Sequence, residues 1–130
     1  MTMKKVLIGV TTGASSGAGN TDSGDIFGKL YSILYIPGNI ATGATITITC
    51  KNGAPGATPF TQTLLVKASA GTANVMFYPR ELVNATADGA ALTGTSGGDR
   101  ACPLVAGRIN FAVASGDNSK TGYVVIYYED

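Results

Sequence analysis

A Gly-rich stretch near the start of the sequence, VTTGASSGAGN over residues 10–20, is the segment best suited to bind a cofactor. It follows an apolar run, and a strand that ends in such a turn can bring its backbone close to a pyrophosphate. That arrangement requires a helix to begin at once and to point its free N–H groups at the phosphates. Residues 20–29, NTDSGDIFGK, instead contain two glycines, each of which costs a helix about 1 kcal/mol relative to Ala. We therefore expect no helix and no dinucleotide site here.

The glycine spacing also permits a more specific comparison. Thr12, Gly13, Gly17 and Gly19 match the TGxxxGxG turn of short-chain dehydrogenases, which the segment resembles. That family also uses a Tyr followed four residues later by a Lys, and none of the six tyrosines has this neighbour. A doubly wound dinucleotide enzyme needs several units of about 30 residues each, more than this chain provides. The segment is interpreted as a Gly/Ser-rich loop or arm over residues 11–25, and a small enzyme built on it is the least favoured alternative.

The other reactive side chains are few. The chain has no histidine, which removes Ser/His and Cys/His nucleophile pairs and His-ligated zinc. Asn20, Asp22 and Asp25 could bind calcium, but they do not follow the EF-hand spacing, and a solvated turn is the favoured interpretation. Cys50 and Cys102 are expected to be buried thiols on strands, with a disulfide as the alternative. We expect no enzymatic activity, no cofactor and no metal.

Composition and charge exclude several partners. Nine Lys and Arg against eight Asp and Glu give a net charge of +1, too little to attract nucleic acid or an anionic membrane. No apolar stretch approaches the length of about 18 residues needed to span a membrane, and the run at residues 6–10 is too short for a secretion signal. Only 13% of the residues are charged, against about 25% in a typical domain. The sparse charge predicts a surface that other protein partly covers.

Alternation of β-branched and aromatic residues with polar ones predicts strands along most of the chain. We expect one domain over residues 1–130, folded as an all-β, antiparallel two-sheet sandwich of jelly-roll or Greek-key type with about eight strands. An immunoglobulin-like sandwich is the second choice, because the chain has no Trp. Residues 108–129 are predicted to form a hairpin, and residues 84–100 a long surface loop that contact with neighbouring copies would hold in place. The expected strands span residues 4–10, 26–36, 44–51, 61–67, 72–79, 102–106, 108–115 and 123–129.

Two of these strands are apolar on both faces. In KLYSILYIP, residues 29–37, Tyr31 and Tyr35 alternate with other apolar residues, and GYVVIYYED at residues 122–130 repeats the pattern. A sandwich strand needs only one apolar face, so the second face is interpreted as a surface buried against partner subunits. A wider core or a segment folded over the outer face is the alternative. The candidate interface residues are Ser15, Asn20, Tyr31, Tyr35, Tyr123, Tyr127 and Tyr128.

The runs ELVNATADGAALTGTSGGDRACPLVAGRINFAVASG and KTGYVVIYYED, within residues 25–130, resemble small virion proteins encoded near the major capsid gene of tailed bacteriophages. The resemblance implies a cement or decoration protein without enzymatic activity or cofactor. It implies a symmetric homo-oligomer bound to the major capsid protein on the capsid surface, assembled in the host bacterial cytoplasm. The alternative is a tail- or fibre-associated module that binds carbohydrate, which exposed, coplanar Tyr31 and Tyr35 beside a groove would favour.

Overall fold

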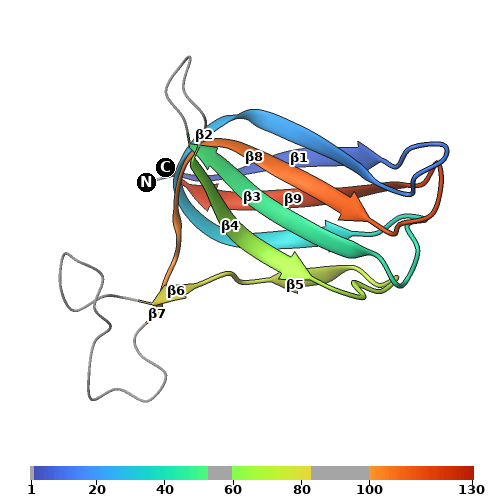
Figure 1. The fold of residues 1–130 in the computed structure, drawn as a ribbon. Coiled ribbons are helices and arrows are strands. Elements are labelled where there is room, and N and C mark those ends of the chain that lie inside the picture. The colour runs from blue at the N-terminus through green and yellow to red at the C-terminus, as the bar shows by residue number, and fades with distance from the viewer. Residues whose placement is uncertain (1, 53–59, 83–99) are drawn as a thin grey trace.

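Strands make up all of the regular secondary structure that a computed structural model describes, which covers residues 2–52, 60–82 and 100–130 (Figure 1). Every strand pairing is antiparallel, so the all-β, antiparallel prediction is confirmed. The strands are β1 (Met3–Thr11), β2 (Gly19–Ile36), β3 (Thr45–Asn52), β4 (Phe60–Lys67), β5 (Val75–Phe77), β6 (Glu81–Leu82), β7 (Arg100–Ala101), β8 (Leu104–Ala114) and β9 (Thr121–Glu129).

The strand bounds agree with the sequence pattern where alternation is unbroken. β1, β3 and β4 lie within one residue of their predicted limits, whereas β2 begins at Gly19 instead of residue 26. The predicted loop over residues 11–25 is therefore wrong in extent, because a strand and not a loop occupies its second half. Residues 102–106 and 108–115 belong largely to one strand, β8. The predicted loop at residues 84–100 lies outside the described residues except for its last position.

The seven larger strands form one sheet in the order β1-β9-β2-β8-β3-β4, with β5 also paired to β2, and β6 and β7 form a separate pair. β8 and β9 are consecutive in the chain but do not pair, because β2 lies between them. The hairpin predicted over residues 108–129 is therefore wrong. β2 can separate them because its 18 residues are long enough to pair with β8 along one part and with β9 along the other.

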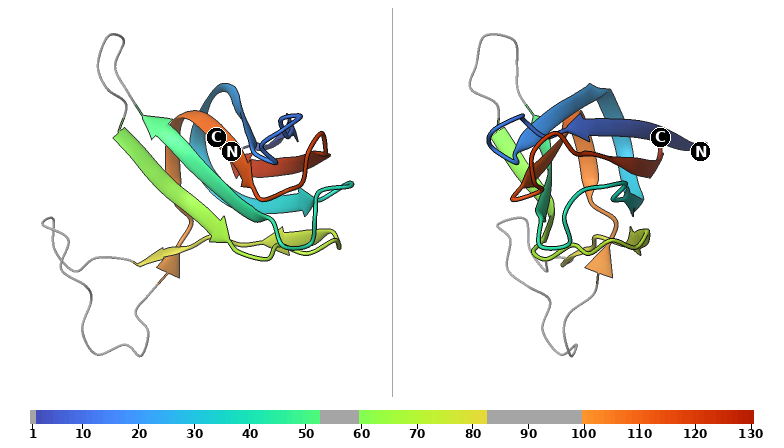
Figure 2. Two further views of the ribbon diagram at one scale, coloured as in Figure 1. Left: turned by 45° about the vertical axis from the view of Figure 1, so that its right-hand side comes forward. Right: turned by 90° about the vertical axis from the view of Figure 1, so that its right-hand side faces the viewer.

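β2 bends where its pairing changes. Its first part pairs with β8 as far as Lys29, and from Lys29 onward it pairs with β9, with a register shift between Leu30 and Ser32. The sheet curves at this point, so that its two portions face each other across a shared interior (Figure 2). Hydrogen bonding thus makes one continuous sheet where two separate ones were expected. The jelly-roll or Greek-key assignment stays a prediction.

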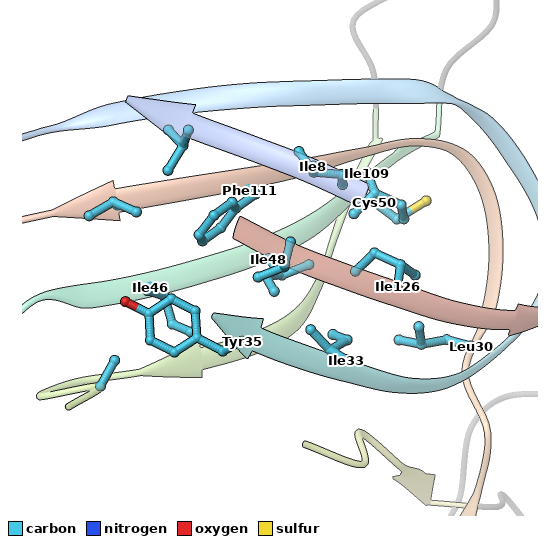
Figure 3. Close-up of a cluster of buried hydrophobic side chains, with 14 of the residues drawn as sticks. Ile8, Leu30, Ile33, Tyr35, Ile46, Ile48, Cys50, Ile109, Phe111 and Ile126 are labelled. Atoms are coloured by element: carbon cyan, nitrogen blue, oxygen red, sulfur yellow. The ribbon is translucent and has the colours of Figure 1, made fainter. Parts of the chain in front are cut away.

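The core lies on the concave side of the curved sheet and takes side chains from both portions (Figure 3). The ring of Tyr35 on β2 meets the ring of Phe111 on β8 edge to face, with centroids 6.3 Å apart. Tyr35 is 0% exposed, so its assignment to an interface is wrong. The irregularity between Leu30 and Ser32 is the physical reason, because it breaks the strict alternation that would put Tyr31 and Tyr35 on one face.

The loop between β1 and β2 is held by the turn between β8 and β9. The Thr12 hydroxyl donates to the Asp117 carbonyl at 2.6 Å and accepts from the Lys120 N–H at 2.8 Å. The Gly116 N–H also donates to the Gly17 carbonyl. The position of this loop is therefore set by its own chain, and contact with neighbouring copies is not needed to hold it.

The two cysteines differ in their surroundings. Cys50 is buried on β3, as predicted, and this burial raises the pKa of its thiol. Cys102 is half-buried and lies between β7 and β8, so its placement on a strand is wrong. Neither cysteine forms a disulfide in the described structure.

Candidate protein-binding face

The outer surface of β1, β9, β5 and the second part of β2 carries a continuous set of apolar side chains, here called the apolar face. Its central row runs across four strands in register, through Leu7, Val125, Leu34 and Met76. Leu7 is 61% exposed and Met76 is 37% exposed. Of nine large apolar side chains that are exposed among the described residues, six lie on this face: Met3, Leu7, Tyr31, Met76, Tyr78 and Tyr123.

A glycine keeps one end of the apolar face flat. Gly9 on β1 pairs with Tyr123 on β9, and a Cβ at position 9 would lie only 2.9 Å from Cε1 of the Tyr123 ring. The ring therefore lies over the glycine backbone instead of standing away from the sheet. Tyr123 remains 39% exposed, so its ring offers its outer surface to a partner.

Two hollows lie on either side of Tyr127. The first has a volume of about 230 Å³ and the second a volume of about 390 Å³. At the first hollow the rings of Tyr31 and Tyr78 meet edge to face, with centroids 6.4 Å apart. The first hollow is lined by Met3, Tyr31, Ser32, Met76, Tyr78 and Tyr127, and the second by Lys5, Leu7, Val125 and Tyr127.

Arg80 is fixed at the edge of the first hollow. Its Nη1 donates to the carbonyl of Tyr31 at 2.9 Å and to that of Pro79 at 2.6 Å. Its Cζ lies 5.6 Å from the ring centroid of Tyr31 and 5.9 Å from that of Tyr78, within the range of a cation–π interaction. The guanidinium is thus held in one place by two carbonyls and two rings.

The outer surface of β8, β3, β4 and the first part of β2 is largely polar. Asn110 donates to Asp22 Oδ1 at 2.8 Å and to Asn20 Oδ1 at 3.2 Å, and Lys51 Nζ lies 3.3 Å from Asp22 Oδ1. A cationic side chain therefore already accompanies the Asp22 carboxylate, which makes this a poor place for calcium. Exposed apolar side chains are fewer here than on the apolar face: Phe27, Val66 and Leu104.

The Asp22 carboxylate gives a prediction of pH dependence. The hydrogen bond from Asn110, followed by Lys51 and Arg108, lowers the pKa of Asp22 below its ordinary value. A lowered pKa means that this stabilisation is present above the unfolded-state pKa of about 3.9 and is lost as pH falls through the folded-state value. We expect Asp22→Asn to flatten the fall in unfolding free energy below about pH 4, measured by urea unfolding across that range. Asp25→Asn, on the same strand, is the control, and an equal flattening by both variants would contradict the assignment.

The candidate interface residues separate into distinct places. Tyr31, Tyr123 and Tyr127 lie on the apolar face, while Tyr128 is half-buried and packs against the core. Ser15 is exposed in the loop between β1 and β2, and Asn20 lies on the polar surface. The structure thus groups three of the seven predicted residues and leaves their role in an interface a prediction.

Sequence reasoning missed part of the apolar face. Leu7 was detectable, since it is a large apolar residue at an outward position between inward-facing Val6 and Ile8. Met76, Tyr78 and Arg80 gave no signal, because β5 has only three residues and no period can be recognised in it.

Within the residues described here, no helix is long and apolar enough to cross a membrane.

Comparison with known proteins gives one structural likeness. No protein-family model and no curated protein matches the sequence. A solved structure of infectious bursal disease virus, Gx strain, matches 98% of this chain at 11% sequence identity and a TM-score of 0.32. This chain spans 37% of the length of that chain. The likeness is too low to assign a family, and the function is inferred from the apolar face itself.

Proposed function

We propose that this chain is a non-enzymatic structural protein of a virion, which binds the outer capsid lattice through its apolar face and stabilises the head as a cement or decoration protein. The observation that carries the proposal is the apolar face, with six exposed large apolar side chains on one outer surface of the sheet. Contiguous apolar patches on a folded protein are characteristic of surfaces that bind other proteins. The resemblance to small virion proteins of tailed bacteriophages supports a capsid as the partner.

The partner is the major capsid protein, and the chain acts as a symmetric homo-oligomer. Attachment of several copies through linked contacts multiplies the affinity of each, so that an individual interface near the lower limit of about 1,000 Å² is sufficient. In this assembly the curved sheet is a jelly-roll-like sandwich that presents its apolar face to the lattice.

Carbohydrate binding at a tail or fibre loses the pair of side chains that it required. Tyr35 is buried in the core and cannot form a platform with Tyr31. The rings of Tyr31 and Tyr78 meet at an interplanar angle of 87°, which does not provide a flat aromatic surface for a sugar.

The test compares two equally exposed apolar residues on opposite outer surfaces. Leu7 on the apolar face is 61% exposed and Val66 on β4 is 59% exposed. We expect Leu7→Asp to weaken binding to heads that lack the protein by at least about tenfold, equivalent to about 1.4 kcal/mol, because it places a charge in the buried centre of the contact. Val66→Asp is expected to bind like the unmodified chain. Binding is measured by co-sedimentation with heads from a strain in which the gene is deleted, and head stability by heating the same particles.

Two results would count against the proposal. Heads that resist heat equally well with and without the protein would remove the stabilising role. Equal binding by Leu7→Asp and Val66→Asp, with both variants folded, would remove the apolar face as the docking surface.

A further inference from the structure

We infer that the first hollow and Arg80 together form a binding site for an apolar side chain that is followed by a carboxylate, supplied by an acidic, extended segment of the partner. The inference rests on the proposed function, because it names the chemistry that the apolar face recognises.

The hollow itself selects an apolar group. Three tyrosine rings and two methionine side chains line it, and its only other lining residue is Ser32. Methionine thioethers adapt to the shape of a bound group and interact favourably with aromatic rings. A volume of about 230 Å³ with no charged side chain in its lining favours one apolar side chain over a polar one.

Arg80 supplies the recognition of the carboxylate. Only its Nη1 donates in the described structure, while a guanidinium has five N–H groups in a fixed fork that matches the two oxygens of a carboxylate. No carboxylate among the described residues forms an ion pair with Arg80. The contacts with two carbonyls and two rings already restrict its motion, so that binding an anion costs little further side-chain order.

The charges near both hollows favour an acidic partner. Lys5 lines the second hollow and forms no ion pair among the described residues, so a positive charge lies at each hollow. Glu129 lies in a cross-strand row with Met3 and Lys29 and lines neither hollow, and Asp130 is paired with Lys4. A partner segment with one or more carboxylates therefore complements this end of the apolar face.

The experiment uses methionine signals that come from the hollow. Two of the three methionines, Met3 and Met76, line it, so methyl-¹³C-methionine labelling places NMR probes inside the proposed site. The probe compounds are 4-phenylbutyrate and its neutral amide, which share the apolar group and differ only in the carboxylate. We expect both methyl signals to shift on titration, and the carboxylate to bind at least about fivefold more tightly than the amide. The Val66 backbone amide is the reference signal away from the site.

Substitution of Arg80 tests the second half of the site. Arg80→Gln is expected to abolish the preference for the carboxylate, and Arg80→Lys to retain part of it, because a lysine keeps the charge without the two-pronged geometry. Arg108→Gln, on the polar surface, is the matched control and should retain the full preference.

Three outcomes would overturn the inference. They are no shift of either methionine signal with either compound, equal affinity for the two compounds, and an unchanged preference in Arg80→Gln. The first two need no variant, so a folding defect cannot obscure them. If Leu7→Asp loses binding to heads while the hollow binds neither compound, this inference fails and the proposed function stands. If the compounds bind but Leu7→Asp attaches normally, the proposed function fails instead.

Discussion

Replacing Gly28 with valine is expected to lower the free energy of unfolding by about 3 kcal/mol or more. Gly28 lies at the bend of β2 with φ of +149°, a region that residues with a side chain rarely adopt. A Cβ at this position would overlap the carbonyl oxygen of Glu129 at the end of β9. Backbone strain of about 1–3 kcal/mol therefore adds to a steric cost of similar size. Urea unfolding of the variant and the unmodified chain measures the difference.

Gly24 on the same strand is the matched control. No atom lies within 4 Å of a Cβ built at Gly24, and its φ is not in the left-handed region. Gly24→Ala is therefore expected to change stability by no more than about 1 kcal/mol, and in the stabilising direction if the unfolded chain loses freedom. Gly28→Ala should fall between the two and remains measurable if the valine variant does not fold. A cost for Gly28→Ala as small as that for Gly24→Ala would show that the bend does not depend on glycine.

The strands were predictable where one inward and one outward set of residues alternate without interruption. β1, β3 and β4 meet that condition, and their limits agree with the pattern. The beginning of β2 was not predictable, because Asn20, Asp22 and Gly24 are typical of loops. There the pairing with β8 determines the conformation, and tertiary context overrides the local preference.

The pairing of strands was less predictable than their positions. Strands adjacent in the sequence usually pair, which led to the hairpin expected at residues 108–129. That rule fails here because β2 is long enough to lie between β8 and β9. Its length could not be recognised while its polar first part was interpreted as a loop.

The candidate site was half-predictable for a related reason. Tyr123 and Tyr127 lie on the outer face as their alternation indicates, because β9 pairs with β1 without a register shift. Tyr31 and Tyr35 were expected to share a face and do not, because β2 has a register shift beside Tyr31. A bulge leaves little mark on the sequence, yet it reverses which residues face the core.

Phe111→Ala is the second substitution with a large expected effect, a loss of about 3–5 kcal/mol of unfolding free energy. Phe111 is 0% exposed and contributes the β8 side of the contact with Tyr35, which joins the two portions of the curved sheet. Truncation removes buried apolar area, leaves a cavity and abolishes an edge-to-face pair worth about 0.5–1.5 kcal/mol. Urea unfolding gives the loss, provided that the slope with denaturant is unchanged.

Tyr35→Phe, on the other side of the same contact, should have the opposite sign. Its hydroxyl is buried with no hydrogen-bond partner among the described residues, and burial raises its pKa. Removing an unsatisfied buried hydroxyl while the ring stays in place relieves a desolvation cost, so we expect a gain of about 1 kcal/mol. If Tyr35→Phe instead destabilises the fold by more than about 1 kcal/mol, the hydroxyl has a partner that stabilises the folded state. If Phe111→Ala costs less than about 1 kcal/mol, the two portions of the sheet do not depend on this ring contact, since packed cores seldom tolerate such a truncation.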